Sequence, residues 1–327
     1  MQPLSPQPLV SIIVPSFNQG RFIARTLDSI LGQSYRPLEV VVVDGASRDD
    51  TVAVLKDYAA RFPELRWQSE PDKGVADAVN KGLALARGEV LAIQSSDDIY
   101  YADAVAKAVA ALRDHPECGM AYGDSDNIDV EDRLLSRYRV PEFSWEAFFG
   151  MALCLPQSSI FFRAELARQI GGWNAKYFAC DIDYWLRLLL RAPAVKLPGV
   201  LSAWRVYLEQ RTQHRNKQKI WDGHWQMIED CAELKQASPR LQRLARASRH
   251  ALALRYHPSG DLMQIRWHAL CAFVLHPGFW RYWRLQELKK LLPGFGLARN
   301  VWRRLRPYQP PAPGPRIVPG GPAPISP

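Results

Sequence analysis

The chain has 327 residues and five scattered cysteines with no Cys-x-x-Cys pair. It shows no signal-peptide pattern, and no apolar run approaches the roughly 20 residues that span a bilayer. These features argue against a disulfide framework and a clustered-cysteine zinc site, and they indicate a reducing compartment. Residues 1–199 carry a net charge of −5 and residues 200–327 carry +14, so we expect the second part to meet an anionic partner.

Apolar runs alternate with helical patterns in the first hundred residues. Strands are predicted at residues 10–14, 38–43, 65–69 and 90–93, of which the second and the fourth are expected to be buried. Helical periodicity separates them, beginning near Arg21, Asp49 and Val75. This order predicts parallel strands, right-handed crossovers and a doubly wound α/β sheet.

Polar clusters follow three of these strands, at residues 16–18, 44–47 and 95–98, and a fourth precedes a helix at residues 72–74. Ligands bind beyond the carboxyl ends of strands in such sheets, so the clusters are expected to meet in one cleft. The loop after the first strand lacks the Gly-x-Gly-x-x-Gly pattern of dinucleotide-binding domains, which argues against hydride transfer.

Two pairs of acids allow more than one interpretation. Asp97 and Asp98 suit a hard divalent cation that bridges phosphates, but they also suit the cap of a helix beginning near Tyr101. Asp181 and Asp183 lie in the first turn of a predicted amphipathic helix. Acids there are favoured by the helix dipole, and the alternative is a catalytic base on a rigid helix start.

Five short motifs occur in order over residues 8–210. They read Val-Ser-Ile-Ile-Val-Pro-Ser-Phe-Asn at 10–18, Val-Val-Val-Asp-Gly-Ala-Ser at 41–47, Glu-Pro-Asp-Lys-Gly at 70–74 with Asp77 and Asn80, Ser-Ser-Asp-Asp at 95–98, and Cys-Asp-Ile-Asp-Tyr-Trp-Leu-Arg at 180–187. Together they resemble the inverting glycosyltransferases of family 2, of the bacterial glycan-assembly type. The resemblance implies the GT-A fold, a doubly wound α/β sheet that binds a nucleotide-diphosphate sugar.

The resemblance also implies an activity. A sugar would move from the nucleotide donor, with UDP favoured, to a hydroxyl of a glycan or lipid-linked acceptor in polysaccharide or cell-envelope synthesis. Asp181 would be the general base of this single displacement. Asp97 and Asp98 would hold Mg²⁺ or Mn²⁺, which stabilises the leaving diphosphate.

Further residues match the nucleotide-sugar site of the family. Phe17 would pack on the base, Asp44 would accept a hydrogen bond from it, and Pro15 and Asn18 would shape the pocket. The remaining donor contacts would fall on Asp72, Lys73, Asp77 and Ser96. The acceptor or phosphate side is predicted at Gln157, Trp173 and Arg205.

The sequence departs from the family pattern at two positions. Ser95 replaces the first acid of the Asp-x-Asp metal motif, and Cys180 stands where the family often has Glu. We therefore expect a weak or altered metal dependence. The alternative to an enzyme is a catalytically degenerate glycan-assembly or binding protein of the same fold. A nucleotidyltransferase is disfavoured because residues 15–20 lack both a lysine and several glycines.

The predicted organisation is a flexible N-terminus at 1–8, the GT-A domain at 9–210, a basic helical extension at 211–306 and a disordered Pro/Gly-rich tail at 307–327. Seven of the eleven tryptophans lie after residue 200, among many arginines. Such helices suit an anionic membrane surface, although an appendage with solvated arginines fits equally. No nucleic-acid recognition motif is present. A cytoplasmic protein, peripheral on the inner face of the membrane, is expected.

Overall fold

The computed structural model describes residues 1–150, 154–207, 216–282, 291 and 314–324. One mixed sheet runs through the molecule in the strand order β3-β2-β1-β4-β8-β6-β9-β5, and β7 pairs with the outer part of β6. The strands are β1 Val10–Ser16, β2 Leu38–Asp44, β3 Leu65–Ser69, β4 Val90–Ile93, β5 Ile99–Tyr100, β6 Met120–Ile128, β7 Leu134–Tyr138, β8 Ile160–Arg163 and β9 Ala194–Arg205.

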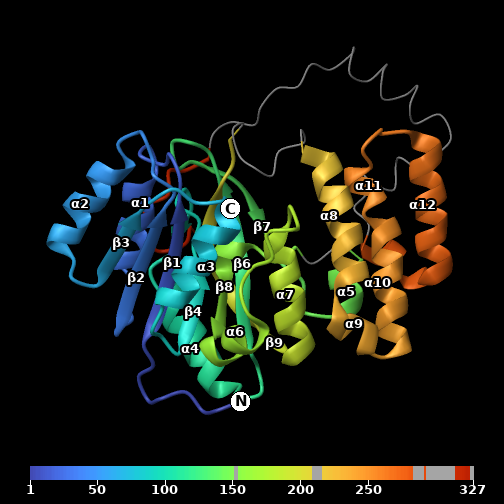
Figure 1. The fold of residues 1–327 in the computed structure, drawn as a ribbon, viewed down its shortest axis with the longest axis horizontal. Coiled ribbons are helices and arrows are strands. Elements are labelled where there is room, and N and C mark those ends of the chain that lie inside the picture. The colour runs from blue at the N-terminus through green and yellow to red at the C-terminus, as the bar shows by residue number, and fades with distance from the viewer. Residues whose placement is uncertain (151–153, 208–215, 283–290, 292–313, 325–327) are drawn as a thin grey trace.

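Helices cover the sheet and continue beyond it (Figure 1). Those between the strands are α1 Ile23–Leu31, α2 Thr51–Arg61, α3 Val75–Leu85, α4 Ala104–Asp114, α5 Trp145–Phe149, α6 Ala164–Ile170 and α7 Cys180–Arg191. Those after the sheet are α8 Lys217–Asp230, α9 Ala232–Gln236, α10 Pro239–Ala251, α11 Ala253–Tyr256 and α12 Leu262–Leu275. Two 3₁₀ turns, η1 Gln157–Ser159 and η3 Pro277–Tyr282, complete the described elements.

The first four strands form the predicted parallel half of the sheet. β1 pairs in parallel with both β2 and β4, and β2 pairs in parallel with β3. Beyond β4 the sheet is mixed, because β8 enters antiparallel between β4 and β6. β9 then runs parallel to β6, and the short β5 pairs antiparallel with the end of β9. This last pairing brings Arg205 close to the turn between β4 and β5.

The two faces of the sheet have separate cores, because successive side chains of a strand point to opposite faces. Ile12 and Val14 of β1 pack in a cluster with residues of α1 and α4. Ile13 packs on the other face with residues of α3, α6 and α7.

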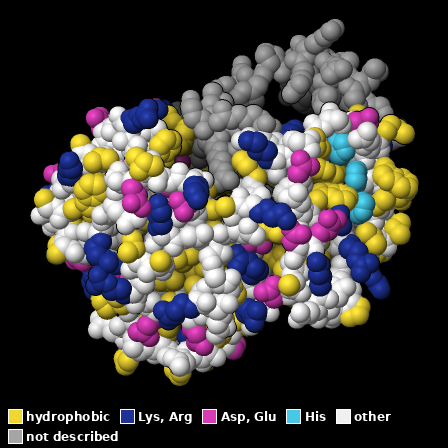
Figure 2. Space-filling model, viewed as in Figure 1, with side chains coloured by type: hydrophobic (Ala, Val, Ile, Leu, Met, Phe, Trp, Pro, Cys, Tyr) yellow, Lys and Arg dark blue, Asp and Glu magenta, His cyan; other side chains and the backbone are white. Residues whose placement is uncertain are grey.

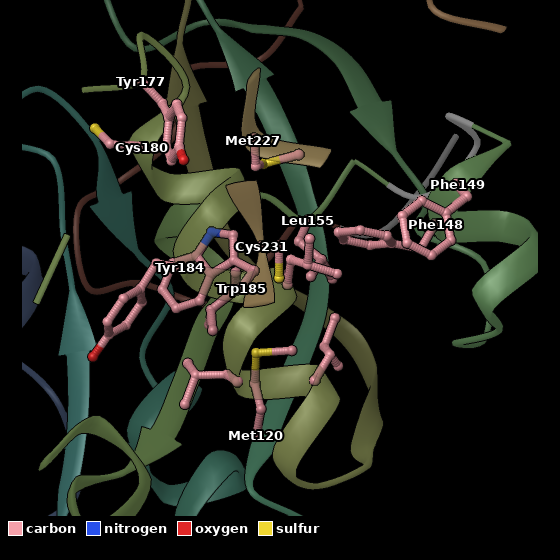
Figure 3. Close-up of a cluster of buried hydrophobic side chains, with 14 of the residues drawn as sticks. Met120, Phe148, Phe149, Leu155, Tyr177, Cys180, Tyr184, Trp185, Met227 and Cys231 are labelled. Carbon is pink, nitrogen blue, oxygen red and sulfur yellow. The ribbon is translucent and has the colours of Figure 1, made fainter. Parts of the chain in front are cut away.

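The second core continues into the C-terminal helices. Trp185 of α7 is 1% exposed and belongs to the same cluster as Met227 of α8 and Leu244 of α10. Figure 3 shows Trp185 and Tyr184 in this cluster with Met227, Cys231 and the aromatic pair Phe148–Phe149 of α5. Residues 217–275 therefore share a hydrophobic core with α7. Within the described residues, no helix is long and apolar enough to cross a membrane.

The end of the chain differs from the disorder predicted for residues 307–327. Residues 314–324 return to the sheet, where Arg316 forms an antiparallel bridge with Arg133. Ile317 is 5% exposed and packs with Ile99 and Ile128. The Pro/Gly-rich composition suggested disorder because it offers few apolar side chains, but one buried isoleucine and several backbone hydrogen bonds hold the segment. Residues 307–313 and 325–327 lie outside the described part of the chain.

Candidate active site

The carboxyl ends of β1 and β2 carry a hydrogen-bonded pair of loops. Asp44, fully buried at the end of β2, accepts the Ser47 N–H at 2.9 Å and the Ser69 hydroxyl at 2.6 Å. Asn18, whose φ is +52°, accepts the Arg48 N–H at 2.9 Å and donates its own N–H to the Ser47 hydroxyl at 2.7 Å. Pro15 lies within β1, one residue before its end. These predicted pocket residues therefore lie together, with Asp44 as a buried anchor of the loops.

Phe17 and Asp72 flank Gly45 at this edge of the sheet. A Cβ at Gly45 would lie 2.7 Å from the Asp72 Oδ2 and 3.2 Å from the Phe17 ring, so a larger residue would displace the Asp72 carboxylate from this position. The Phe17 side chain is 58% exposed. Asp72 is held by the Gly74 N–H at 2.8 Å. An exposed ring beside a carboxylate offers a stacking surface and a hydrogen-bond acceptor for a heterocyclic base.

Asp77 and Lys73 lie at the start of α3 and have different surroundings. Asp77 accepts the Lys73 N–H at 3.1 Å and lies 3.5 Å from the ammonium of Lys81. These contacts lower the pKa of Asp77, the backbone hydrogen bond more than the lysine charge. Asp77 thus stabilises the first turn of α3, whereas Lys73 is exposed at the helix end that favours anions.

Asp97 and Asp98 lie between β4 and β5 and turn to different environments. Asp98 is 3% exposed, and its Oδ1 accepts the Arg205 N–H at 3.0 Å. Burial raises the pKa of Asp98 well above its ordinary value, the neighbouring Asp97 charge adds to this, and hydrogen bonds from Arg205 and Ser158 oppose it. Asp97 is half-buried and accepts the Tyr207 hydroxyl at 2.7 Å.

The capping interpretation of Asp97 and Asp98 is not what the structure shows. Helix α4 begins at Ala104, and Asp103 occupies its N-cap position. The strand β5 separates the two acids from that helix. The two acids therefore lie on the turn between β4 and β5, and their metal-binding role stays a prediction.

The buried position of Arg205 argues against the predicted contact with a phosphate or an acceptor. Its side chain is fully buried, with Nε donating to the Asp97 carbonyl at 2.8 Å and Nη1 to the Asp129 carbonyl at 2.7 Å. Nη2 lies 2.6 Å from the Asp132 carboxylate, a charge contact rather than an aligned hydrogen bond. Arg205 therefore braces the Asp97 loop. The partner Asp132 was not predicted, because no local pattern marks a residue that becomes a partner only through strand pairing.

A divalent cation such as Mg²⁺ or Mn²⁺ requires oxygen ligands. Among the described residues, no group of three or more His, Cys, Asp and Glu side chains could hold a metal. Mg²⁺ commonly binds through one or two carboxylates together with substrate phosphates and water. Asp97 with a bound diphosphate fits that pattern, and Asp98, turned toward the Arg205 N–H, fits a supporting role.

The two acids of α7 also have different surroundings. Asp183 is buried and pairs with Arg187 at 2.8 Å, and Arg187 donates to the carbonyls of Ile170 and Gly172. Burial raises the pKa of Asp183, and the Arg187 charge opposes this. Asp183 is thus part of an internal ion pair. Asp181 lies half-buried in the first turn of the helix, where the dipole favours a carboxylate.

The burial of Trp173 argues against the predicted acceptor contact, because this residue is only 4% exposed. The Asn80 side chain holds its backbone, accepting the Trp173 N–H at 2.6 Å and donating to the Trp173 carbonyl at 2.9 Å. The indole packs 6.3 Å from the ring of Tyr184. Trp173 therefore links α3 to α7 inside the core.

The remaining predicted residues lie beside the turn between β4 and β5 that carries Asp97 and Asp98, which we call the acid loop. The Gln157 amide donates to the Ser95 hydroxyl at 3.2 Å, and Ser96 is 5% exposed. Tyr207, two residues after Arg205, reaches this loop from the end of β9 through its hydrogen bond to Asp97. Two hollows of about 400 and 510 Å³ lie elsewhere, against α3 and α6 and against α7 and α9, and neither is lined by Asp44, Asp97 or Asp98.

Comparisons with known proteins fit this arrangement. Residues 11–167 match Glycosyl transferase family 2. An uncharacterized glycosyltransferase of Mycobacterium tuberculosis is 37% identical over 200 residues, which are 59% of this chain and 74% of that protein. The chondroitin synthase of Escherichia coli is 33% identical over 183 residues, 55% of this chain, but the chain spans only 26% of that synthase.

Two solved structures share the fold over most of their length. A mannosyltransferase of Pyrobaculum calidifontis, in complex with GDP-Man and Mn²⁺, has a TM-score of 0.61 and 23% identity, covering 93% of this chain and 86% of that one. TarS of S. aureus, in complex with UDP-GlcNAc, has a TM-score of 0.61 and 15% identity, covering 92% and 93%. The chain is thus a member of glycosyl transferase family 2 with the GT-A fold, and it is a glycosyltransferase.

Proposed function

We propose that this glycosyltransferase transfers a sugar from a nucleotide diphosphate, with UDP favoured, to an acceptor hydroxyl with inversion at the anomeric carbon. The observation that carries the proposal is the placement of Phe17, Asp72 and Asp97 on loops at the carboxyl ends of β1, β3 and β4, in the parallel half of the sheet. Two structural neighbours were solved with nucleotide-diphosphate sugars, which supports this class of donor.

The donor residues act as binding groups in this proposal. Phe17 stacks on the base, and Asp72 accepts a hydrogen bond from it. Asp44 keeps the loops in place and retains lone pairs for a base N–H, because a carboxylate has about four acceptor sites. Lys73, exposed at the start of α3, attracts the diphosphate.

Asp97 is the residue that would hold Mg²⁺ or Mn²⁺. The buried Asp98 would stabilise the loop through its hydrogen bond from the Arg205 N–H. A bound divalent ion would neutralise the charge that develops on the leaving diphosphate. Because Ser95 replaces a carboxylate, the protein supplies few metal ligands, and affinity for the ion should depend on the nucleotide.

Asp181 is proposed as the general base. It would take the proton of the acceptor hydroxyl as the oxygen attacks the anomeric carbon from the face opposite the leaving group. Asp183 is the less suitable candidate because its charge is paired with Arg187 inside the protein. The acceptor is proposed to be a hydroxyl of a glycan or of a lipid-linked sugar.

The first test is nucleotide binding measured by thermal shift. UDP, GDP, dTDP and CMP are each added with Mn²⁺ and with EDTA, because a ligand of the folded state raises the unfolding temperature by mass action. A shift with UDP that needs Mn²⁺ is expected. A UDP shift that persists in EDTA would contradict metal ligation by Asp97, and no shift with any nucleotide would contradict the donor site.

The competing function is a glycan-binding protein of the same fold without turnover, which the departures at Ser95 and Cys180 favour. It predicts that Asp181→Asn changes nothing measurable. Release of UDP from a UDP-sugar in the presence of a glycan acceptor distinguishes the two, since only the enzyme loses turnover in that variant.

We propose that the region after residue 210, which follows the predicted transferase domain, binds an anionic membrane surface. Helix α12 exposes five large apolar side chains, between 46% and 71%, at Met263, Trp267, Leu270, Phe273 and Val274. Figure 2 shows hydrophobic side chains gathered at the edge of the molecule that α12 forms. Residues 262–306 hold nine basic residues and one acid, so the charge suits an anionic lipid surface.

Vesicle co-sedimentation tests this partner. Binding to phosphatidylcholine mixed with phosphatidylglycerol is expected to exceed binding to phosphatidylcholine alone. The double variant Trp267→Ser, Leu270→Ser should lose it, whereas Leu135→Ser, at a 44% exposed position of β7, should not. Equal vesicle binding by both variants would contradict the proposal. A molecular mass of the protein that rises with its concentration would also contradict it, because the exposed face of α12 would then pair two copies of the chain.

A further inference from the structure

The described end of the chain, residues 314–324, crosses the loops that position Asp97 and Asp98, and we call it the C-terminal strap. On one side it pairs with the segment that follows the two acids. Gly320 donates its N–H to the Tyr100 carbonyl at 3.1 Å, and Ala102 donates to the Gly321 carbonyl at 3.0 Å. These backbone contacts lie within four residues of Asp98.

On its other side the strap pairs with the turn between β6 and β7. Ile317 donates its N–H to the Asp132 carbonyl at 2.7 Å, and Leu134 donates to the Pro315 carbonyl at 2.9 Å. Further along, Arg137 donates to the Pro324 carbonyl at 2.9 Å. The strap thus joins β5 to the β6–β7 turn, two parts of the chain that are not neighbours in sequence.

Asp132 transmits this contact to the acid loop. It is 1% exposed, its φ is +67°, and its carboxylate lies between Arg205 at 2.6 Å and Arg25 at 3.2 Å. Arg205 in turn holds the Asp97 carbonyl through Nε and the Asp98 carboxylate through its backbone N–H. A continuous series of contacts therefore runs from the strap to both acids.

Ile317 is the apolar anchor of the strap. It packs with Ile99, Tyr101, Ile128 and Ala203, and Ile99 directly follows Asp98. The next residue, Val318, points outward and is 68% exposed. The two adjacent residues thus form a natural pair of test and control positions.

We propose that the C-terminal strap is a positioning element of the donor site, acting through Asp132 and Arg205 on the carboxylates of Asp97 and Asp98. The inference rests on the proposed donor and metal roles of that loop. Two adjacent acids repel each other, so their loop needs a cation held beside it. Without the strap, the Asp132 turn loses the backbone partners that keep it against Arg205, and Asp97 is no longer preorganised.

The test compares Ile317→Asp with Val318→Asp in the full chain. Isothermal titration measures UDP binding with Mn²⁺ and with EDTA. Ile317→Asp is expected to weaken Mn²⁺-dependent UDP binding by about tenfold or more, the scale seen when a partner of a metal ligand is lost. Val318→Asp should stay within about twofold of the unaltered protein, as an exposed substitution usually does. Ile317→Val should retain binding.

Amide hydrogen exchange separates failure of this inference from failure of the proposed function. In Ile317→Asp, but not in Val318→Asp, the N–H of Arg205 and the amides of residues 98–102 should exchange faster without any ligand. If the unaltered protein binds no UDP, the donor proposal fails. Amide hydrogen exchange alone then tests whether the strap holds the loop of Asp97 and Asp98 in place. Equal amide exchange and equal UDP binding in both variants would overturn the proposed positioning role of the strap.

Asp132→Asn covers the case in which Ile317→Asp does not fold. Asn tolerates the positive φ of this position and keeps the shape of the side chain, but it removes the charge that faces Arg205 and Arg25. The same loss of Mn²⁺-dependent binding and the same faster exchange at Arg205 are expected. Unchanged binding and exchange in a folded Asp132→Asn protein would likewise contradict the proposal.

Discussion

The sheet region and the C-terminal helices bury opposite kinds of titratable group. The sheet region, with a net charge of −5 over residues 1–199, buries the carboxylates of Asp44 and Asp98 at the ends of strands. The helices after residue 216 bury the imidazole of His224 and bring His250 within 2.9 Å of His268. The buried carboxylates of Asp44 and Asp98 accept hydrogen bonds from the loops around them, whereas the buried His224 packs within a helical core.

The two regions nevertheless share one hydrophobic cluster through α7. Trp185 and Tyr184 lie on the sheet side, and Met227, Cys231 and Leu244 lie on the helical side of the same core. A difference in charge and chemistry therefore does not imply independent folding. The following experiments probe whether activity belongs to the first region and stability to both.

The largest effect is expected for Asp181→Asn at the start of α7. Loss of a general base lowers the turnover rate by about 10²–10⁴-fold, while nucleotide binding should change little because the donor loops are untouched. The measurement is UDP release from a UDP-sugar with a glycan acceptor, beside UDP titration. Asp50→Asn, an exposed acid before α2, is the control. A loss of UDP binding as large as the loss of turnover would place Asp181 in the donor site instead.

Trp185→Ala tests the shared core. Removing a fully buried tryptophan costs about 3–5 kcal/mol, so the midpoint of chemical unfolding should fall. Because the core is continuous, tryptophan fluorescence and far-UV circular dichroism should report one transition. Trp204→Ala, at a 36% exposed position, should have a much smaller effect. Two separate transitions in the unaltered protein would show that the regions unfold independently.

Acid should destabilise the helical region through His224. Burial, and secondarily the Arg249 charge, lowers the pKa of His224 from 6.5 to about 4. The folded state therefore binds fewer protons than the unfolded state between these values, so stability present at pH 7 is lost as the pH falls from 6.5 to 4. The shift corresponds to about 3 kcal/mol. Urea unfolding across this range measures it, and His224→Gln should flatten the dependence. An equally steep loss in that variant would assign the effect to other groups.

The smallest effect is expected at Phe17, which should affect binding but not folding. Base stacking on an aromatic ring contributes about 1–3 kcal/mol, so Phe17→Ala should weaken UDP binding by roughly tenfold or more. Because the ring is 58% exposed, the free energy of unfolding should change little. Leu135→Ala removes a similarly exposed side chain from β7 and serves as the control. Equal UDP affinity in both variants would remove Phe17 from the base pocket.

Much of the fold was visible in the sequence because local patterns encode it. The observed β3 and β4 begin and end at the predicted residues, β1 extends two residues further and β2 one residue further. The predicted polar clusters lie after β1, β2 and β4, since parallel strands place their carboxyl ends at one edge. The motifs that resemble family 2 were likewise local, and the comparisons confirm that family.

Other features were decided only by the tertiary structure. The roles of Arg205, Asp132 and Ile317 depend on the pairing of β5 with β9 and on the return of the chain end to the sheet. No periodicity reports such contacts, because they join residues far apart in sequence. Burial decided the rest: it made Trp173 a core residue and distinguished Asp98 from Asp97. The sequence determined which chemical groups stand at the strand ends, and long-range packing decided which of them face a ligand and which hold the others in place.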